Sequence, residues 1–280
     1  MKPAKSSRGR GIYVLDDIGD VSYGELSVIQ QYISNPLLLD GFKWDLRLYV
    51  LVTSFQPELE AYVYKEGFAR FATVPFTMQD FSPLIHLTNT SIQRHNEHNQ
   101  RHTRETMVGG TKIDLRTLRS KLQCLNISWD TIWHKMVDCI LKSLCVAHDH
   151  VPANPNAFEI FGYDLMFDAN LNCWLIEVNA SPSLGVDHLI DEQVKTPMID
   201  DTIDLVQPKA FNREKLLQVL TRRSRELKTA KNPGPQLAVD LAAVLDNDLA
   251  NAEPPLGNYQ RIAPSDHWSQ ILKLKSQLFR

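Results

Sequence analysis

The sequence predicts an α+β fold, in which helices pack against a mainly antiparallel sheet. Three observations lead to this class. A long alternating strand pattern covers residues 43–54 and is followed by further strand-like runs. Two stretches with helical spacing come next, and a pair of apolar runs within residues 158–179 is separated by a short turn. Because short turns join antiparallel neighbours, the sheet should be mainly antiparallel.

The bulk composition is that of a globular protein. The 280 residues are 43% hydrophobic and 22% charged, and the formal net charge is −3. This balance provides no global attraction to nucleic acid or to a membrane surface, so we expect neither as a partner. The four cysteines show no CxxC spacing, which is typical of free thiols in the cytosol. No apolar run is long enough to span a membrane, and the N-terminus has no signal-peptide pattern.

The first expected elements are a basic, glycine-containing loop and a strand, "KPAKSSRGRGIYVL", then "SVIQQYI". A complete domain would place a strand ahead of such a loop, so we expect the chain to be a fragment. Residues 43–54 alternate as a strand that separates two kinds of side chain. The apolar face carries Trp44, Leu46, Leu48, Val50 and Val52, and the polar face carries Lys43, Asp45, Arg47 and Tyr49.

The remaining elements follow from local patterns. Two further strands are expected in "EAYVYKEG" and "FARFATVPF", with Glu66 and Gly67 forming the turn between them. Helices are predicted over 113–123 and 129–148, the second from its apolar side chains at helical spacing. The other expected segments are a polar loop at 86–112, a short helix at 200–207, a basic helix at 211–231, and a Pro-, Asn- and Ala-rich connection at 232–258.

The hairpin at 158–179 brings acidic side chains together. Its turn, "DANLN", has its symmetry point between residues 170 and 171, which places Asp164 opposite Glu177, about 4.5–5.5 Å apart at Cβ. Asn179 lies on the same face as Glu177. The other face is expected to be a core made of Tyr163, Leu165, Phe167, Trp174, Ile176 and Val178.

Two facing carboxylates repel each other unless a cation or a proton lies between them. An oxygen set of Asp164, Glu177 and Asn179 is the ligand type that Mg²⁺ prefers, and bound Mg²⁺ often contacts nucleotide phosphates. The alternative is a solvated acidic face on an edge hairpin, and spacing alone does not separate the two.

The N-terminal loop "KPAKSSRGRGI" combines glycines with cations. Small residues let backbone N–H groups approach phosphate oxygens, and the cations neutralise their charge. The loop matches neither GxxxxGK[ST] nor GxGxxG, so a disordered basic N-terminus is the alternative.

Several blocks, taken in order, resemble the tubulin–tyrosine ligase-like family. They are "KPAKSSRGRGI", "QQYISNPLLLDGFKWDLRLYVLVTS", "GFARFATVPF", "HLTNTSIQ" and "FEIFGYDLMFDANLNCWLIEVNASPSL". The resemblance covers roughly residues 1 to 207 and implies an ATP-grasp-like fold that uses ATP and Mg²⁺ to ligate an amino acid to a protein. Family members carry a domain and a strand before the glycine loop, so we expect the N-terminal lobe to be missing.

The resemblance also implies roles for individual residues. The nucleotide-binding set is Lys2, Arg10, Gly11, Gln30, Gln31, Tyr32, Ile33, Lys43, Thr88 and Asn89. The magnesium ligands are Asp164, Glu177 and Asn179, and the incoming amino acid is held by Arg47, Ser91, Lys112 and Lys195. Lys2, Arg47 and Glu177 are the expected catalytic residues. Arg47 suits an acidic amino acid because a guanidinium can pair with a carboxylate through two bonds, although a structural pairing with Asp45 is the alternative.

Among family members, the sequence is most similar to the glutamate-adding polyglutamylases. The resemblance implies addition of free glutamate to glutamate side chains in the acidic C-terminal tails of tubulin or microtubules. In such a reaction the acceptor carboxylate takes the γ-phosphate of ATP, and the amino group of glutamate then displaces phosphate. Two alternatives remain: glycine addition, and a catalytically silent fragment that only binds microtubules.

The expected organisation has three parts. Residues 1–207 form a partial ATP-grasp catalytic region, 208–231 a basic helix, and 232–280 a linker and C-terminal segment. The basic segment carries seven cations against two acids between residues 213 and 231, a charge of +5 that suits an acidic tail. A solvated helix face is the alternative. We expect the protein in the cytoplasm on the cytoskeleton, including the cilium, flagellum or basal body.

Overall fold

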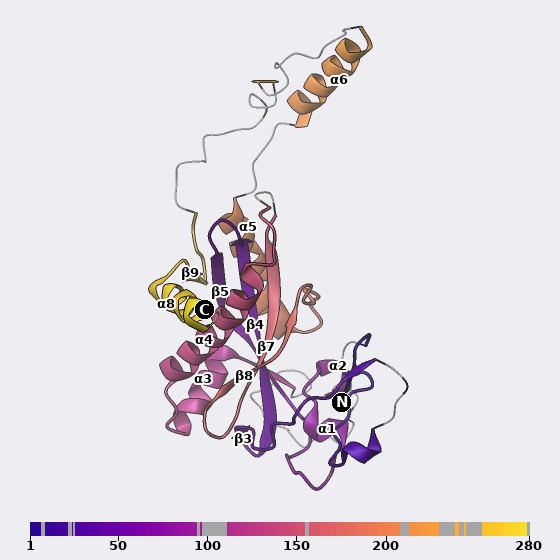
Figure 1. The fold of residues 1–280 in the computed structure, drawn as a ribbon, viewed down its shortest axis with the longest axis vertical. Helices are drawn as coiled ribbons and strands as arrows, with labels where there is room; N and C mark the ends of the chain where they lie inside the picture. Colours follow the sequence, from indigo (N-terminus) through magenta and orange to yellow (C-terminus); the bar gives the residue numbers. More distant parts are fainter. Residues whose placement is uncertain are drawn as a thin grey trace. The chain divides into compact units, whose positions relative to one another are not determined.

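A computed structural model describes most of the chain, and Figure 1 shows its fold. The described residues are 1–6, 9–21, 24, 26–93, 96, 111–154, 157–207, 213–229, 239–240, 244 and 254–278. They fall into two compact units, one made of Met1–Ile199 with Asn258–Arg280 and the other of Asp200–Gly257. None of the helices in the described residues has both the length and the apolar character needed to cross a membrane.

The first unit is built on a seven-stranded antiparallel sheet. Its main path runs β6-β5-β4-β7-β8, with β3 added to β4 and β9 added to β5. The strands are β3 (Leu38–Leu39), β4 (Phe42–Ser54), β5 (Glu60–Phe71), β6 (Lys112–Asp114), β7 (Glu159–Phe167), β8 (Cys173–Asn179) and β9 (Tyr259–Ala263). A separate pair, β1 (Lys2–Pro3) and β2 (Ser27–Val28), holds the N-terminal segment. The expected α+β class with a mainly antiparallel sheet is confirmed.

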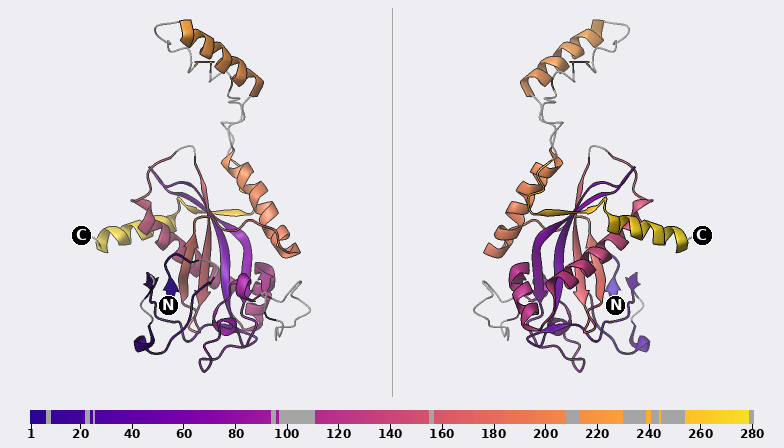
Figure 2. Two further views of the ribbon diagram at one scale, coloured as in Figure 1. Left: turned by 90° about the vertical axis from the view of Figure 1, so that its right-hand side faces the viewer. Right: turned by 90° about the vertical axis from the view of Figure 1, so that its left-hand side faces the viewer.

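Three helices cover one face of this sheet: α3 (Leu115–Cys124), α4 (Trp129–His148) and α8 (Asp266–Leu278). They bury the apolar face of β4 in one core, as the alternation of β4 predicts. Trp44 lies at its centre, with ring centroids 6.4 Å from Phe71 and 6.5 Å from Phe167. Figure 2 shows α8 beside α4, where β9 and α8 return the end of the chain to the main unit.

The helix limits follow from local chemistry. α4 matches its predicted range, and its apolar residues at helical spacing are buried. α3 begins two residues later than expected because Asp114 accepts a hydrogen bond from the backbone N–H of Thr117, 2.7 Å away, and so caps the helix. The short helix α1 (Pro83–His86) ends at the first residue of the expected loop at 86–112, and this loop contains the short helix α2 (Thr90–Gln93). Residues 94, 95 and 97–110 of the loop lie outside the described part.

The turn expected at Glu66 and Gly67 is wrong, because β5 continues through both residues. β5 pairs with β4 on either side, at Leu48 with Gly67 and at Val50 with Val63, and a bulge takes up the difference in register. Gly67 fits because it has no side chain. A Cβ at this position would lie 2.5 Å from the carbonyl oxygen of Arg47.

Gly67→Ala is therefore expected to destabilise the protein by about 1–3 kcal/mol, since the added methyl group would push β4 and β5 apart. Urea denaturation measures this loss of unfolding free energy. Gly24→Ala is the matched control, because a Cβ added there would have nothing within 4 Å of it. Equal stabilities for the two variants would contradict the contact between Gly67 and the β4 backbone.

The β7–β8 hairpin contains a second bulge. Asp164 pairs with Glu177 as predicted, but Leu165 pairs with Leu175, which makes Ile176 the extra residue. The bulge reverses the alternation in β8 on the turn side, so Cys173 and Leu175 pack against the core instead of Trp174 and Ile176. The predicted core set is correct for Tyr163, Leu165 and Phe167 and wrong for Trp174, Ile176 and Val178.

The turn of this hairpin is fixed by one buried carboxylate. Asp168 accepts hydrogen bonds from the backbone N–H groups of Asn170 and Asn172, at 2.9 and 2.8 Å. It also accepts bonds from the side chains of Asn172 and Trp174, both at 3.0 Å. Burial opposes ionisation of Asp168, but these bonds outweigh it and lower the pKa of the carboxyl group.

The polar face of β4 and the N-terminal segment line one cavity. The helix α5 (Leu189–Val206) follows β8 in the chain. The expected short helix at 200–207 is the last part of α5, which is much longer. In the second unit, α6 (Arg213–Thr229) corresponds to the predicted basic helix, and Arg222 forms an ion pair with Asp240 at 2.5 Å. Most of the expected connection at 232–258 lies outside the described residues.

Candidate nucleotide and metal site

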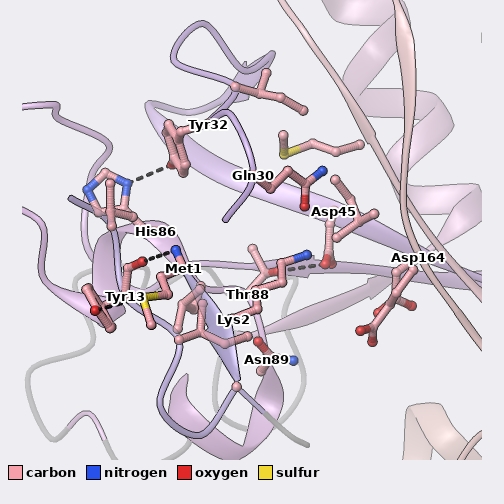
Figure 3. A pocket seen from close by; sticks show the side chains of 18 of the residues that line it. Met1, Lys2, Tyr13, Gln30, Tyr32, Asp45, His86, Thr88, Asn89 and Asp164 are labelled. Atoms are coloured by element: carbon pink, nitrogen blue, oxygen red, sulfur yellow. Dashed lines mark hydrogen bonds between the residues drawn. The ribbon is translucent and has the colours of Figure 1, made fainter. Parts of the chain in front are cut away.

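A cavity of about 680 Å³ opens between the N-terminal segment and the polar face of the sheet. In Figure 3, Tyr32 and His86 lie at one end of it and Asp164 at the other, with Gln30, Asp45 and Thr88 between them. Nine of the ten residues predicted to bind the nucleotide line this cavity: Lys2, Arg10, Gln30, Gln31, Tyr32, Ile33, Lys43, Thr88 and Asn89. The tenth, Gly11, is not in the lining, and its Cα faces Pro3.

A chain of hydrogen bonds fixes the Tyr32 end. Asp80 offers a carbonyl oxygen 2.7 Å from Nε2 of His86, so Nε2 carries the proton and Nδ1 accepts from the Tyr32 hydroxyl, also at 2.7 Å. Lys43 donates to the Tyr32 oxygen at 3.0 Å and to the His86 carbonyl at 2.7 Å. Burial lowers the pKa of His86, which keeps the ring neutral as this arrangement requires.

Lys43 is almost completely buried, at 7% exposure. Burial lowers the pKa of its ammonium group to about 8; Asp45 opposes this shift and Lys2 adds to it. A lysine in this state is charged at neutral pH but loses its proton in the mildly alkaline range. It therefore supplies a positive charge to the cavity that pH can remove.

The glycine loop approaches the cavity closely at Gly9. This residue has φ of +76°, and a Cβ there would overlap the Ile92 side chain and lie 3.0 Å from that of Asn89. A larger residue would strain the backbone at this φ and would have to push aside the ends of the Ile92 and Asn89 side chains. Gln93 anchors the "HLTN" stretch, because its side-chain amide donates to the carbonyl of Leu87 while its side-chain oxygen accepts from the backbone N–H of Thr73 at 2.9 Å.

Two arginines and two aspartates form a buried network at the other end. Arg70 donates to both oxygens of Asp45, at 2.7 and 2.6 Å, and to Asp164 at 2.8 Å. Arg47 donates to Asp164 at 2.5 and 3.1 Å through Nε and Nη2. Arg47 therefore pairs with Asp164 and not with Asp45, which corrects the structural alternative raised from the sequence. Thr88 completes the network with a 2.6 Å bond to Asp45.

The ion pairs determine which group carries charge. Burial alone would raise the pKa of Asp164, but Arg70 and Arg47 outweigh it and hold that pKa below its ordinary value. Arg70 loses solvation on burial, yet Asp45 and Asp164 raise the pKa of its guanidinium group. Both shifts favour the charged forms of Arg70 and Asp164.

Glu177 lies opposite Asp164 and is solvent-exposed on its outer side. Partial burial raises its pKa, and the Asp164 carboxylate and its hydrogen bond raise it further. Asn179 donates to Glu177 and to the carbonyl of Gly162, both at 3.2 Å. In this arrangement the amide nitrogen faces Glu177, so Asn179 would have to turn its amide to offer oxygen to a metal.

The predicted amino-acid residues lie on neighbouring elements. Lys112 of β6 and Lys195 of α5 both bind the fully buried Asp191, at 2.9 and 3.0 Å. Burial would raise the pKa of Asp191, but the two lysines reverse the effect and lower it. Both ammonium groups lie over the Phe68 ring, and Phe68 pairs with Arg47 across β4 and β5. Ser91 is on α2, by the cavity residue Asn89.

Sequence reasoning missed Arg70, Asp45, His86 and Asp191 as site residues. Arg70 could have been recognised from the sequence, because a charged residue in the otherwise apolar run "GFARF" indicates that one face of the strand is polar. Asp191 lies four residues before Lys195 on α5, a spacing at which helical side chains can pair, but its other partner, Lys112, is distant in the chain.

The residues present fit a nucleotide with a divalent cation. Two carboxylates face each other at one end of the cavity, where a proton, the Asp164 partners Arg47 and Arg70, or a divalent cation offsets their repulsion. Lys2, Arg10 and Lys43 line the same cavity and suit phosphate oxygens. Within the described residues, no group of three or more His, Cys, Asp and Glu side chains could hold a metal, so a cation here would keep water or phosphate ligands.

One cavity lies between this antiparallel sheet and the N-terminal glycine loop, and the facing carboxylates Asp164 and Glu177 lie at one end of it. This arrangement is an ATP-grasp-like fold. A model of the "Tubulin-tyrosine ligase family" matches residues 1–215, and the chain belongs to this family. The resemblance noted from the sequence is thus confirmed.

The chain is also similar in sequence to curated proteins named as tubulin polyglutamylases. The chain is 33% identical over 305 residues to "Tubulin polyglutamylase TTLL13" of Mus musculus, covering 100% of this chain and 37% of that protein. It is 38% identical over 214 residues to "Probable tubulin polyglutamylase TTLL2" of Homo sapiens, covering 76% of this chain and 36% of that protein. It is 34% identical over 303 residues to "Tubulin polyglutamylase ttll6" of Danio rerio, covering 100% and 38%. The chain thus spans little more than a third of these relatives.

Proposed function

We propose that the protein is an ATP- and Mg²⁺-dependent ligase that adds glutamate to glutamate side chains of tubulin tails. The observation that carries the proposal is the opposed pair Asp164 and Glu177 at the end of a cation-lined cavity. The family and the names of its relatives support the reaction type and the substrate.

Residues at one end of the cavity would bind the adenine, and residues at the other end would bind the phosphates and the metal. The adenine end would be lined by Gln30, Gln31, Tyr32 and Ile33, while Lys2 and Arg10 would meet the phosphates. Bound ATP and Mg²⁺ would supply the phosphoryl group that activates the acceptor carboxylate and the charge that lowers its repulsion. Asp164, Glu177 and Asn179 would hold the metal; positioning and charge neutralisation need no side-chain nucleophile.

Arg47 supports an acidic amino acid as the substrate. Its contacts with Asp164 use Nε and Nη2, and the Nη1 group has further N–H donors for a substrate carboxylate. Lys112 and Lys195 share the single carboxylate Asp191, which places one positive charge in excess beside Phe68. These cations favour glutamate over glycine, whose side chain has no charge.

The test is incubation of the protein with tubulin, ATP, Mg²⁺ and labelled glutamate, with labelled glycine in a parallel reaction. We expect glutamate incorporation that requires both ATP and Mg²⁺. Incorporation of glycine alone would replace the proposal with glycylation. Binding to microtubules without incorporation of either amino acid would support the silent, microtubule-binding alternative. With a tubulin substrate, the proposed location is the cytoskeleton, including cilia and basal bodies.

The low pKa of Lys43 predicts a pH dependence for nucleotide binding. Lys43 is charged below about pH 8 and neutral above it, so the Kd for ATP should rise as pH increases through this range. Lys2, Asp45, Tyr32 and His86 are the other titratable groups facing it. Isothermal calorimetry with a non-hydrolysable ATP analogue measures the effect.

The matched variant is Lys43→Arg, whose guanidinium stays charged throughout and should flatten the pH profile. Lys65→Arg, at an exposed position of β5, controls for the added bulk and should keep the wild-type profile. A pH-independent Kd in the wild type would show that Lys43 does not contact the nucleotide.

A further inference from the structure

A second hollow lies on the helix-covered side of the sheet, away from the nucleotide cavity. It measures about 510 Å³ and is formed by α4 and the turn side of the β7–β8 hairpin. Two thiols line it, Cys139 from α4 and Cys173 from the first position of β8. The proposed ligase reaction uses neither of them.

The contacts of α4 hold these thiols against each other. Residues 135, 139 and 143 lie four apart on one side of the helix. Lys135 donates to the carbonyl of Leu171 at 2.5 Å, and Ser143 forms a 2.8 Å hydrogen bond with Tyr163 of β7. Cys139 lies between these two attachments, and Cys173 is only two residues beyond Leu171. The helix and the hairpin are therefore fixed on both sides of the thiol pair.

The two thiols differ in chemical character. Both are partly exposed and free, so a small solute in the hollow can reach them. A hydrogen bond from Cys173 lowers the pKa of the Cys139 thiol, against the effects of burial and Asp138, and Lys142 also favours its ionised form. The same contact, together with burial, raises the pKa of Cys173. Cys139 is thus the nucleophilic partner and Cys173 the protonated one.

We propose that Cys139 and Cys173 form a hydroperoxide-reactive dithiol site that closes to a reversible disulfide between α4 and β8. In the first step the Cys139 thiolate attacks one peroxide oxygen; the O–O bond breaks, and the other oxygen leaves as water after taking up a proton. In the second step Cys173 attacks the resulting Cys139 sulfenic acid, an S–S bond forms, and a second water leaves. The two thiols lose two electrons and the hydrogen peroxide gains them.

The test is oxidation of the folded, reduced chain with hydrogen peroxide, followed by alkylation, non-reducing digestion and mass spectrometry. We expect a cross-linked peptide that joins Cys139 to Cys173, lighter than the sum of its parts by two hydrogen atoms and cleaved by dithiothreitol. Cys124→Ser is the matched control, because Cys124 is exposed on α3 away from the hollow and its loss should leave the cross-link unchanged.

A second arm assigns the order of reaction. In Cys173→Ser, a sulfenic acid on Cys139 should accumulate and be trapped by dimedone, whereas Cys139→Ser should give no trapped sulfenic acid on Cys173. Oxidation of Cys124 in preference to Cys139 would overturn the proposal, as would cross-links between separate chains only. The wild-type peptide map alone decides the pairing if either serine variant fails to fold.

Discussion

Replacing Glu177 with glutamine is expected to slow glutamate incorporation by about 100-fold or more, because a metal contact is worth several kcal/mol to the reaction. The substitution keeps the shape of the side chain and removes its charge. The same change should leave the stability of the metal-free protein nearly unchanged, since Glu177 is exposed and the Asp164 charge that it faces is already paired with Arg47 and Arg70.

Two measurements make this expectation specific to the metal. Thermal unfolding should show that Mg²⁺ with an ATP analogue raises the midpoint of the wild type but not that of Glu177→Gln. Glu159→Gln is the matched control, because Glu159 is an exposed glutamate at the first position of β7, beyond the part of this strand that pairs with β8. If Glu177→Gln retained the Mg²⁺-dependent stabilisation, Glu177 would not be a metal ligand.

Arg70→Met should have the largest effect on stability, a loss of about 3–5 kcal/mol. Methionine fills a similar apolar volume but leaves Asp45 without its two-bond partner and Asp164 without one of its two arginines. These carboxylates are 6% and 2% exposed, so solvent cannot replace the lost bonds. Urea denaturation measures the difference in unfolding free energy.

The control for this substitution is Arg119→Met, since Arg119 is exposed on α3. We expect its unfolding free energy to change by no more than about 0.5 kcal/mol. Equal effects of the two substitutions would mean that the Asp45–Arg70–Asp164 network contributes nothing to folding. The unfolding free energy of Arg70→Lys should lie between those of the wild type and Arg70→Met, because one ammonium group cannot reproduce the two parallel bonds of a guanidinium.

Local patterns were sufficient for much of the framework. The alternation of residues 43–54 correctly separated the buried face of β4 from its charged face. The helical spacing gave α4 its full length, and the symmetry of the β7–β8 hairpin placed Asp164 opposite Glu177. Each of these features depends on residues close together in the chain, where periodicity and turn geometry act directly.

Features that depend on distant partners were not predictable in this way. Gly67 resembled a turn residue, but its role is to let β5 pass the backbone of β4. Arg47 pairs with Asp164, more than a hundred residues away, and not with the nearby Asp45. Asp191 pairs with the nearby Lys195 of its own helix, but its second partner, Lys112 of β6, is 79 residues away. Such pairs depend on tertiary contacts that one sequence does not reveal.

The bulge in β8 suggests how homologues with a β8 strand one residue shorter would differ from this protein. Ile176 is the extra residue, and its removal would restore an uninterrupted ladder in which Glu177 still faces Asp164. Ile176 also forms part of the cavity wall. A deletion at this one position would therefore spare the acidic pair while reshaping the chamber beside it. Homologues that lack this residue should keep the acids and accept a differently shaped occupant.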